Sequence, residues 1–274
     1  MKNVEKNLYD DCGVLHHIIN STKNKQRKET LSRIESNILL AYNQYPTDFT
    51  ALNGIKRSCC NNDDERQSLI KLYNSRAKII KKMKKEILNK VALCPYCYYA
   101  NTVDTIDHFF PKSIFPEYSI YSFNLIPCCS KCNRIKSDTL PSSGKRYIHF
   151  YVDPIPDKKW FYVKLAWNAA YDRADLDITL DSTVLGTDMK KLIMGHFDNL
   201  KLLSKYEKEM VHLISDSMES LNGERDVDRC CWHFSIRYND EKKNYGENYY
   251  LTALFHELST NHEFVKNMIQ SVYD

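Results

Sequence analysis

Glycine is scarce in this sequence, and none of the glycines belongs to a phosphate-binding loop. Only 7 of the 274 residues are glycine, and neither GxxxxGK[ST] nor GxGxxG occurs. A chain without these loops lacks the backbone cradle that they provide for nucleotide phosphates. We therefore expect any nucleotide-driven step to depend on a partner protein.

Long apolar segments are also absent. No apolar run approaches the roughly 20 residues needed to span a bilayer, and the N-terminal segment MKNVEKNLYDDCGVLHH has no apolar stretch of the kind found in secretory signals. Internal repeats, low-complexity tracts and proline-rich linkers are missing too. We expect a cytoplasmic protein that makes no membrane contact.

Two hydrolase signatures are excluded by spacing and sequence. His256 and His262 are six positions apart, whereas the HExxH signature of metalloproteases needs two histidines one helical turn apart. The GxSxG elbow of serine hydrolases does not occur. We therefore expect neither a zinc peptidase nor a serine hydrolase of this type.

What the sequence does have is a globular composition that is rich in cysteine. Its residues are 43% hydrophobic and 27% charged, and its net charge is +4. Ten cysteines in a reducing compartment favour metal ligation and buried thiols over a disulfide framework. We expect a helical region at residues 1–90, a compact central unit at residues 91–153 and a mainly helical region at residues 154–274.

The spacing of apolar residues predicts a mostly helical chain with a few strands. We expect helices at residues 28–42, 65–90 and 188–223, and two short helices within residues 248–273. Asp188 is the expected N-cap of the third helix, and Gly223 its expected end. Runs rich in aromatic and branched side chains predict short strands at residues 147–153, 160–167 and 175–180.

The expected helix at residues 65–90 is strongly basic. It carries nine lysines or arginines against two acids, a local net charge of +7. Within it, we single out Lys81, Lys82, Lys84 and Lys85 as candidate nucleic-acid contacts. A charge run of this kind is also typical of a solvated helix face, and the sequence leaves that alternative open.

Two CxxC pairs predict a structural zinc site. They are Cys94-Pro-Tyr-Cys97 and Cys129-Ser-Lys-Cys132, and 31 residues separate them. Each pair can supply two thiolates from one tight turn, and two pairs complete the tetrahedral shell of four cysteines that Zn²⁺ prefers in structural sites. Such a shell leaves no position open for catalysis.

The other cysteines give weaker signals. Cys128 is expected to be a packed neighbour of the second pair rather than a ligand. Cys59-Cys60 and Cys230-Cys231 are vicinal, which is a geometry poorly suited to chelating one ion. A further site that includes His233 with the second vicinal pair is conceivable, against the alternative of buried or surface thiols.

Three polar segments lie between and just after the CxxC pairs. They are Asp107-His108-Phe109-Phe110-Pro111-Lys112-Ser113, Asn124-Leu125-Ile126-Pro127 and Asn133-Arg134-Ile135-Lys136. Together with the cysteine pairs, they resemble the HNH endonuclease superfamily, in the form with asparagine at the last motif position. The resemblance covers residues 93–138 closely. It implies an α+β protein, mostly α-helical, with an embedded zinc-stabilised ββα-metal nuclease unit between Asp104 and Asp138.

The resemblance also implies a role for each matching residue. His108 matches the general base, Asp107 and Asn133 match the ligands of a catalytic Mg²⁺ or Mn²⁺, and Asn124 matches the residue that ties down the loop between the two strands. These roles agree with the chemistry of phosphodiester hydrolysis, because neutral imidazole can accept a proton from water near pH 7 and oxygen ligands suit Mg²⁺.

Further basic residues lie in and after these segments. Lys112, Arg134 and Lys136 are candidate phosphate contacts, with ordinary surface charge as the alternative. His149 lies in a segment that loosely resembles the box following the motif in many bacterial HNH proteins. The sequence leaves open whether His149 belongs to the site or to the core.

The function implied by the resemblance is hydrolysis of nucleic-acid phosphodiester bonds, with DNA as the expected substrate. Within the superfamily, the chain looks similar to HNH subunits that are paired with ATPases in Septu-like and retron-associated bacterial defence systems. A regulatory partner such as an ATPase is therefore expected. Two alternatives stay open, which are a non-catalytic zinc-stabilised nucleic-acid-binding module and a nuclease that cleaves RNA.

Overall fold

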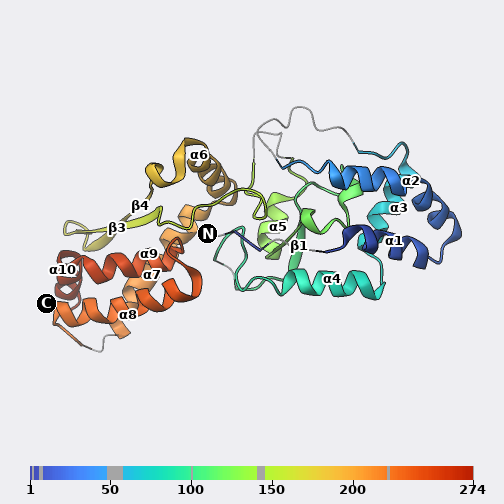
Figure 1. The fold of residues 1–274 in the computed structure, drawn as a ribbon. Coiled ribbons are helices and arrows are strands. Elements are labelled where there is room, and N and C mark those ends of the chain that lie inside the picture. Colours follow the sequence, from blue (N-terminus) through green and yellow to red (C-terminus); the bar gives the residue numbers. More distant parts are fainter. Residues whose placement is uncertain are drawn as a thin grey trace. The chain divides into compact units, whose positions relative to one another are not determined.

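The chain folds into two compact units. The computed structural model describes residues 1, 3–5, 9–47, 58–99, 101–140, 146–220 and 223–273 (Figure 1). The first unit, called here the N-terminal unit, is Asn3–Asp153. The C-terminal unit is Pro154–Asp274 together with Met1–Lys2. Most of the described residues are helical and two small antiparallel sheets accompany them, so the expected α+β class is confirmed.

The N-terminal unit places one two-stranded sheet among helices. Its helices are α1 (Asp11–Ser21), α2 (Lys25–Asn43), α3 (Asp63–Tyr73), α4 (Lys78–Leu88) and α5 (Ser130–Lys136), with the short 3-10 helices η2 (Pro116–Tyr118) and η3 (Ser122–Asn124). Strand β1 (Thr105–His108) pairs antiparallel with β2 (Leu125–Cys128). Helix α4 packs against both strands, and α5 packs against β1 (Figure 1).

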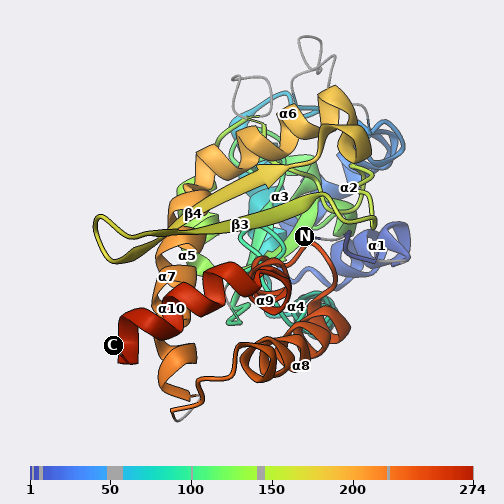
Figure 2. The ribbon, with the colours of Figure 1, turned by 90° about the vertical axis from the view of Figure 1, so that its left-hand side faces the viewer.

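The C-terminal unit is a β-hairpin with helices around it. Its elements are β3 (Phe161–Asn168), β4 (Arg173–Leu180), α6 (Ser182–Leu200), α7 (Leu202–Ser220), α8 (Val227–Tyr245), α9 (Tyr250–Thr260) and α10 (His262–Tyr273). Helices α9 and α10 lie beside the hairpin on the β3 side, and α8 packs against α9 (Figure 2). The expected strands at residues 160–167 and 175–180 and the two expected C-terminal helices are confirmed.

The basic stretch at residues 65–90 forms two helices where the sequence predicted one. Helix α3 ends at Tyr73 and α4 begins at Lys78. Between them, the backbone nitrogen of Ala77 donates to the hydroxyl of Ser75 at 3.2 Å. Serine side chains compete with helical hydrogen bonds in this way, which accounts for the interruption.

The expected helix at residues 188–223 is also divided. Its first part begins earlier, with Asp181 as the N-cap of α6, and Asp188 lies inside the helix. Gly186 interrupts the helical backbone with φ of 70°, and Lys201 separates α6 from α7 in a left-handed conformation. Gly223, the expected end, lies beyond the last residue of α7 with φ of 85°.

Two further expectations differ from the structure. Residues 147–153 form no strand, because the backbone nitrogens of Val152 and Asp153 both donate to the carbonyl of His149 and close a turn. Helix α8 was not predicted, since Cys230, Cys231 and Phe234 are its buried residues and its apolar spacing is weak. Among the described residues, no helix is long and apolar enough to cross a membrane.

Candidate active site and metal centre

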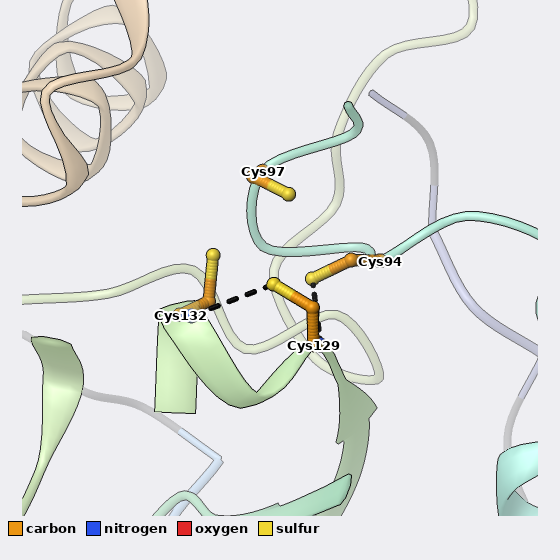
Figure 3. Close-up of side chains that lie close together, drawn as sticks. All are labelled: Cys94, Cys97, Cys129 and Cys132. Atoms are coloured by element: carbon orange, nitrogen blue, oxygen red, sulfur yellow. Dashed lines mark hydrogen bonds between the residues drawn. The ribbon is translucent and has the colours of Figure 1, made fainter. Parts of the chain in front are cut away.

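The four cysteines of the two CxxC pairs meet in one buried cluster. The sulfur atoms of Cys94, Cys97, Cys129 and Cys132 all lie within 4.8 Å of one another, and all four residues are buried (Figure 3). A tetrahedron of four sulfurs around Zn²⁺, with Zn–S distances of about 2.3 Å, has edges of roughly 3.8 Å. The cluster therefore has the ligand type, number and spacing of a structural zinc site.

The start of α5 explains how the second pair reaches this geometry. Cys129 is the N-cap residue of α5, and its sulfur accepts a hydrogen bond from the backbone nitrogen of Cys132 at 3.4 Å. The CxxC spacing thus coincides with the spacing between an N-cap and the third helical residue. The backbone nitrogen of Cys129 in turn donates to the sulfur of Cys94 at 3.2 Å, which links the two pairs. Hydrogen bonds from the neighbouring thiols lower the pKa of the Cys129 thiol.

Two other cysteine sites had been considered from the sequence. Cys128 is buried beside the cluster but is not among its ligands, and burial raises the pKa of its thiol well above the ordinary range. Cys230 and Cys231 are buried in α8, whereas His233 is exposed. Within the described residues these three do not gather as a metal-binding group.

The cysteine cluster stands at one end of a strand–strand–helix unit that carries the polar motif. In the β1–β2 register, Asp107 pairs with Ile126 and His108 pairs with Leu125. Thr105 and Asp107 lie on the same face of β1, because alternate residues of a strand point to the same side. Helix α5 covers this face: Asn133 donates to the Thr105 hydroxyl at 3.1 Å, and Lys136 contacts the carboxylate of Asp107. His108 follows Asp107 and is directed elsewhere, so the two neighbours have separate partners.

His108 is held in one orientation at the end of β1. Its side chain is 7% exposed, and Nε2 lies 3.0 Å from the carbonyl oxygen of Ser119. A carbonyl oxygen only accepts hydrogen bonds, so Nε2 carries the proton in the neutral ring and Nδ1 keeps its lone pair. Burial lowers the pKa of His108 to about 3, with further lowering from Lys112 and other cations nearby. The imidazole is therefore neutral at pH 7.

An aromatic ring and two lysines surround His108. The ring of Tyr73, at the end of α3, lies edge-on to the imidazole with centroids 4.4 Å apart. The ammonium of Lys84, from α4, lies 3.4 Å from the centroid of the Tyr73 ring, and that of Lys112 lies 5.4 Å from it. Burial and the charge of Lys112 lower the pKa of Lys84. The two ammonium groups therefore lie near His108.

Asn124 fixes the loop that connects β1 to β2. Its fully buried side chain accepts from the backbone nitrogen of Phe110 at 2.8 Å and donates to the Phe110 carbonyl at 3.0 Å. It also donates to the carbonyl of Tyr118 at 3.3 Å and accepts from the hydroxyl of Tyr45 at 3.0 Å. One amide thus ties both ends of the loop to each other and to the segment after α2.

His149 lies in the core behind this amide. Its side chain is fully buried, and Nε2 lies 3.1 Å from the same Tyr45 hydroxyl that bonds Asn124. Its backbone nitrogen donates to the carboxylate of Asp153 at 2.7 Å. Burial lowers the pKa of His149 to about 3. The structure therefore places His149 in the core, connected to Asn124 by two hydrogen bonds through the Tyr45 hydroxyl.

Asp107 is engaged by a buried cation. Lys136 Nζ lies 3.0 Å from Oδ2 of Asp107, and the two side chains are only 2% and 3% exposed. The Tyr96 hydroxyl donates to the same oxygen at 2.6 Å. Lys136 also donates to the carbonyl oxygens of His108 and Phe109, each at 3.2 Å. All three ammonium donors of Lys136 therefore have acceptors inside the protein.

This arrangement bears on the catalytic Mg²⁺ or Mn²⁺ that the resemblance implies. The oxygen ligands offered by Asp107 and Asn133 suit such an ion. The carboxylate of Asp107 is nevertheless occupied by Lys136 and Tyr96. As Asp107 is placed, it does not fit a divalent ion, because the ammonium of Lys136 lies beside the carboxylate that would bind that ion.

The remaining basic residues have differing surroundings. Lys81, Lys82, Lys85 and Arg134 are exposed. Lys82 lies 3.8 Å from Glu86 one helical turn away. Lys136, which the sequence suggested as a phosphate contact, is instead buried. The structure thus brings Lys84 and Lys112 to His108 and leaves the other four at the surface of α4 and α5.

Three tyrosines of the site were not identified from the sequence. Tyr73 contacts His108, Tyr96 donates to Asp107, and Tyr45 bridges Asn124 and His149. Tyr96 lies within the first CxxC pair, which was a local signal that could have suggested a place near the site. Tyr45 and Tyr73 are separated from their partners by dozens of residues, and no spacing rule connects them.

Comparison with known proteins provides one limited match. A segment of 69 residues is 32% identical to Protein ea31 of Escherichia phage lambda. That segment is 25% of this chain and 23% of the phage protein, so the chain spans about a quarter of the length of that relative. No protein-family model matches the chain, and no solved structure matches it. The buried four-cysteine cluster is compatible with an HNH-type zinc motif.

Proposed function

We propose that this protein is an endonuclease of the HNH type, which hydrolyses phosphodiester bonds with His108 as the general base. The observation that carries the proposal is the placement of His108. Its Nε2 is bonded to Ser119, its ring contacts Tyr73, and the ammonium groups of Lys84 and Lys112 contact the same tyrosine. A neutral imidazole among cations is suited to a substrate that carries a phosphate.

The base would act through Nδ1. Because Nε2 donates to Ser119, the free lone pair lies on Nδ1, and that nitrogen can accept the proton of an attacking water. The pKa of His108 in the chain alone, about 3, makes the imidazole a weak base. A bound phosphate would raise this pKa, since negative charge nearby favours the protonated ring.

Lys84 and Lys112 would bind the phosphate. Both contact the Tyr73 ring, and their mutual repulsion contributes to the lowered pKa of Lys84. An anion placed between two such cations relieves that repulsion. Lys81, Lys82 and Lys85 are exposed on α4 and would extend the positive charge along the nucleic-acid backbone.

No step of this proposal depends on a divalent metal ion. Asp107 contacts Lys136 in the structure, and a divalent ion would bind the carboxylate only after that ammonium had moved. The four-cysteine zinc would have a structural role, because all four ligand positions are filled by protein. Zinc bound by the four cysteines would add its binding free energy to the stability of the folded unit.

Two other functions are compatible with the zinc cluster. A non-catalytic nucleic-acid-binding module would use the lysines and leave His108 idle, and an RNA nuclease would use the same chemistry on another polymer. We propose DNA as the substrate because the motif resembles that of HNH nucleases. A role in bacterial defence, with an ATPase as partner, rests on the same resemblance.

A substrate panel tests the proposal. The zinc-loaded chain is incubated with circular double-stranded DNA, circular single-stranded DNA and RNA, each with Mg²⁺, with Mn²⁺ and with EDTA. We expect circular DNA to be cut, and the reaction to weaken when Lys84 and Lys112 are both replaced by alanine. The matched control replaces Lys23 and Lys25, which are exposed near the start of α2 and are not among the proposed contacts, and it should cleave like the wild type. Tight binding of DNA and RNA without cleavage of either would favour the binding module.

A further inference from the structure

A second group of metal-binding side chains lies apart from the four-cysteine cluster. The sulfur atoms of Cys59 and Cys60 and a carboxylate oxygen of Glu117 all lie within 4.8 Å of one another. The two cysteines are half-buried just before α3, and Glu117 is a buried residue of η2. Among the described residues, this trio and the four-cysteine cluster are the groups that could hold a metal ion.

The backbone around Cys59 and Cys60 directs both sulfurs to the same ligand position. Vicinal cysteines are poorly suited to chelating one ion when the backbone is extended, because adjacent residues then point to opposite faces. In the structure, the Cys60 backbone nitrogen donates to the Ser58 hydroxyl at 3.1 Å, and that hydroxyl donates to Glu117 at 2.7 Å. This short turn brings the vicinal thiols to one side, where the carboxylate lies.

Glu117 is a carboxylate that needs a cation. Its side chain is 4% exposed. In the part of the chain that the structure describes, no lysine or arginine forms an ion pair with it. The guanidinium of Arg66 donates instead to the carbonyl of Ser113. A buried carboxylate without a paired cation is costly unless a positive charge binds it.

We infer that Cys59, Cys60 and Glu117 form a second metal site, which takes a zinc-like, thiophilic divalent cation. Two sulfurs and one carboxylate oxygen are ligands of Zn²⁺, whereas Mg²⁺ prefers oxygen alone. Binding would release the two thiol protons and form two metal–thiolate bonds. The Glu117 carboxylate would be the third protein ligand. Three protein ligands leave one coordination position open, unlike the closed shell of the four-cysteine cluster.

The location of this site gives a consequence for the proposed nuclease. Glu117 lies two residues before Ser119, whose carbonyl orients His108, and Ser119 is bonded to Pro116 in the same turn. A metal ion bound to Glu117 would therefore restrict the motion of residues 116–119, the segment whose Ser119 carbonyl orients His108. This consequence rests on the proposed function, whereas the metal site itself does not.

Metal content tests the site independently of nuclease activity. The full chain is incubated with excess Zn²⁺, passed through a metal-free desalting column and analysed for zinc and protein. We expect the wild type to retain one equivalent beyond that of the four-cysteine cluster. The double variant Cys59→Ser, Cys60→Ser should lose that equivalent, and Glu117→Gln should hold it more weakly. The matched control is Cys230→Ser, Cys231→Ser, a vicinal pair without a clustered carboxylate, which should retain it.

A second measurement applies if a variant fails to fold. The folded wild type is treated with a thiol-alkylating reagent, with and without Cd²⁺, and the modified cysteines are located by mass spectrometry. We expect Cd²⁺ to slow the alkylation of Cys59 and Cys60 but not that of the exposed Cys12. A wild type that retains only the zinc of the four-cysteine cluster, or equal alkylation with and without Cd²⁺, would overturn the inference.

Discussion

Lys136 and Asp107 form an ion pair inside the N-terminal unit, with Nζ 3.0 Å from Oδ2 and both side chains almost completely buried. Lys136 also donates to the carbonyl oxygens of His108 and Phe109. The pair therefore joins α5 to the end of β1 at the residue that we propose as the base. Its removal should affect both the stability of the unit and the position of His108.

The first prediction concerns this pair. Lys136→Met should lower the free energy of unfolding by about 3 to 5 kcal/mol, because the carboxylate is left buried without a cation. Adding Asp107→Asn should recover a large part of the loss, since no uncompensated charge remains. Urea denaturation of the two single variants and the double variant measures this coupling. Losses in the single variants that simply add in the double variant would show that the two groups are not paired.

The second prediction concerns the four-cysteine cluster. Cys132→Ala should lose one zinc equivalent and should melt at a lower temperature, because the metal contributes binding free energy to the folded state. Cys128→Ala is the matched control, since Cys128 is buried beside the cluster but is not a ligand. Elemental analysis and thermal denaturation give the two readouts. Equal zinc content in Cys132→Ala and the wild type would contradict the ligand assignment.

The third prediction compares two partners in one hydrogen-bond network. Asn124→Ala removes the four hydrogen bonds of a fully buried amide and should cost roughly 3 kcal/mol or more, whereas Tyr45→Phe should cost about 1 kcal/mol. Hydrogen exchange of the Phe110 amide should accelerate in the asparagine variant and should change little in the tyrosine variant. Similar exchange in both would mean that the loop does not depend on Asn124.

The fourth prediction concerns acid stability. Burial lowers the pKa of His108 to about 3 in the folded chain, against an ordinary value of 6.5. Well above pH 6.5 the ring is neutral in both states and adds no pH dependence. As the pH falls from 6.5 toward 3, the unfolded chain binds a proton that the folded chain does not, so stability is lost, by about 2 kcal/mol at pH 5.

A variant separates this effect from other acid-sensitive groups. His108→Asn should show a shallower loss of stability between pH 6.5 and pH 5 than the wild type, because one titrating group is gone. Unfolding midpoints in urea at several pH values provide the comparison. A wild-type slope in His108→Asn would mean that His108 titrates normally.

Much of the site could be predicted from the sequence where the signal was local. The two CxxC pairs identified all four cysteines of the cluster, because each pair is confined to one turn and Cys129 caps the helix that carries Cys132. The breaks at residues 74–77 and at Lys201 were missed, because apolar spacing continues across both. At the first break, the Ser75 hydroxyl accepts a hydrogen bond from the Ala77 backbone nitrogen. Such a bond interrupts the helix without changing the spacing of the apolar residues.

Long-range contacts explain what the sequence could not provide. Lys136 was expected at the surface, where lysines usually lie, and its burial becomes visible only when β1 places Asp107 and two carbonyl oxygens against α5. Tyr73 and Lys84 reach His108 from separate helices, and the relation depends on how α3 and α4 pack. The spacing of apolar residues identifies the apolar face of a helix, but it does not identify the residues that this face contacts.

The rate at which the His108→Ala variant cleaves DNA tests the central claim most directly. The substitution removes the proposed base and leaves the cysteine cluster, Lys84 and Lys112 in place. We predict that the folded variant binds DNA with nearly unchanged affinity and that its cleavage rate falls about 10²- to 10⁴-fold, the usual contribution of a positioned base. His16→Ala, at an exposed histidine, should cleave at the wild-type rate. A folded His108→Ala protein that also cleaves DNA at the wild-type rate would contradict the account.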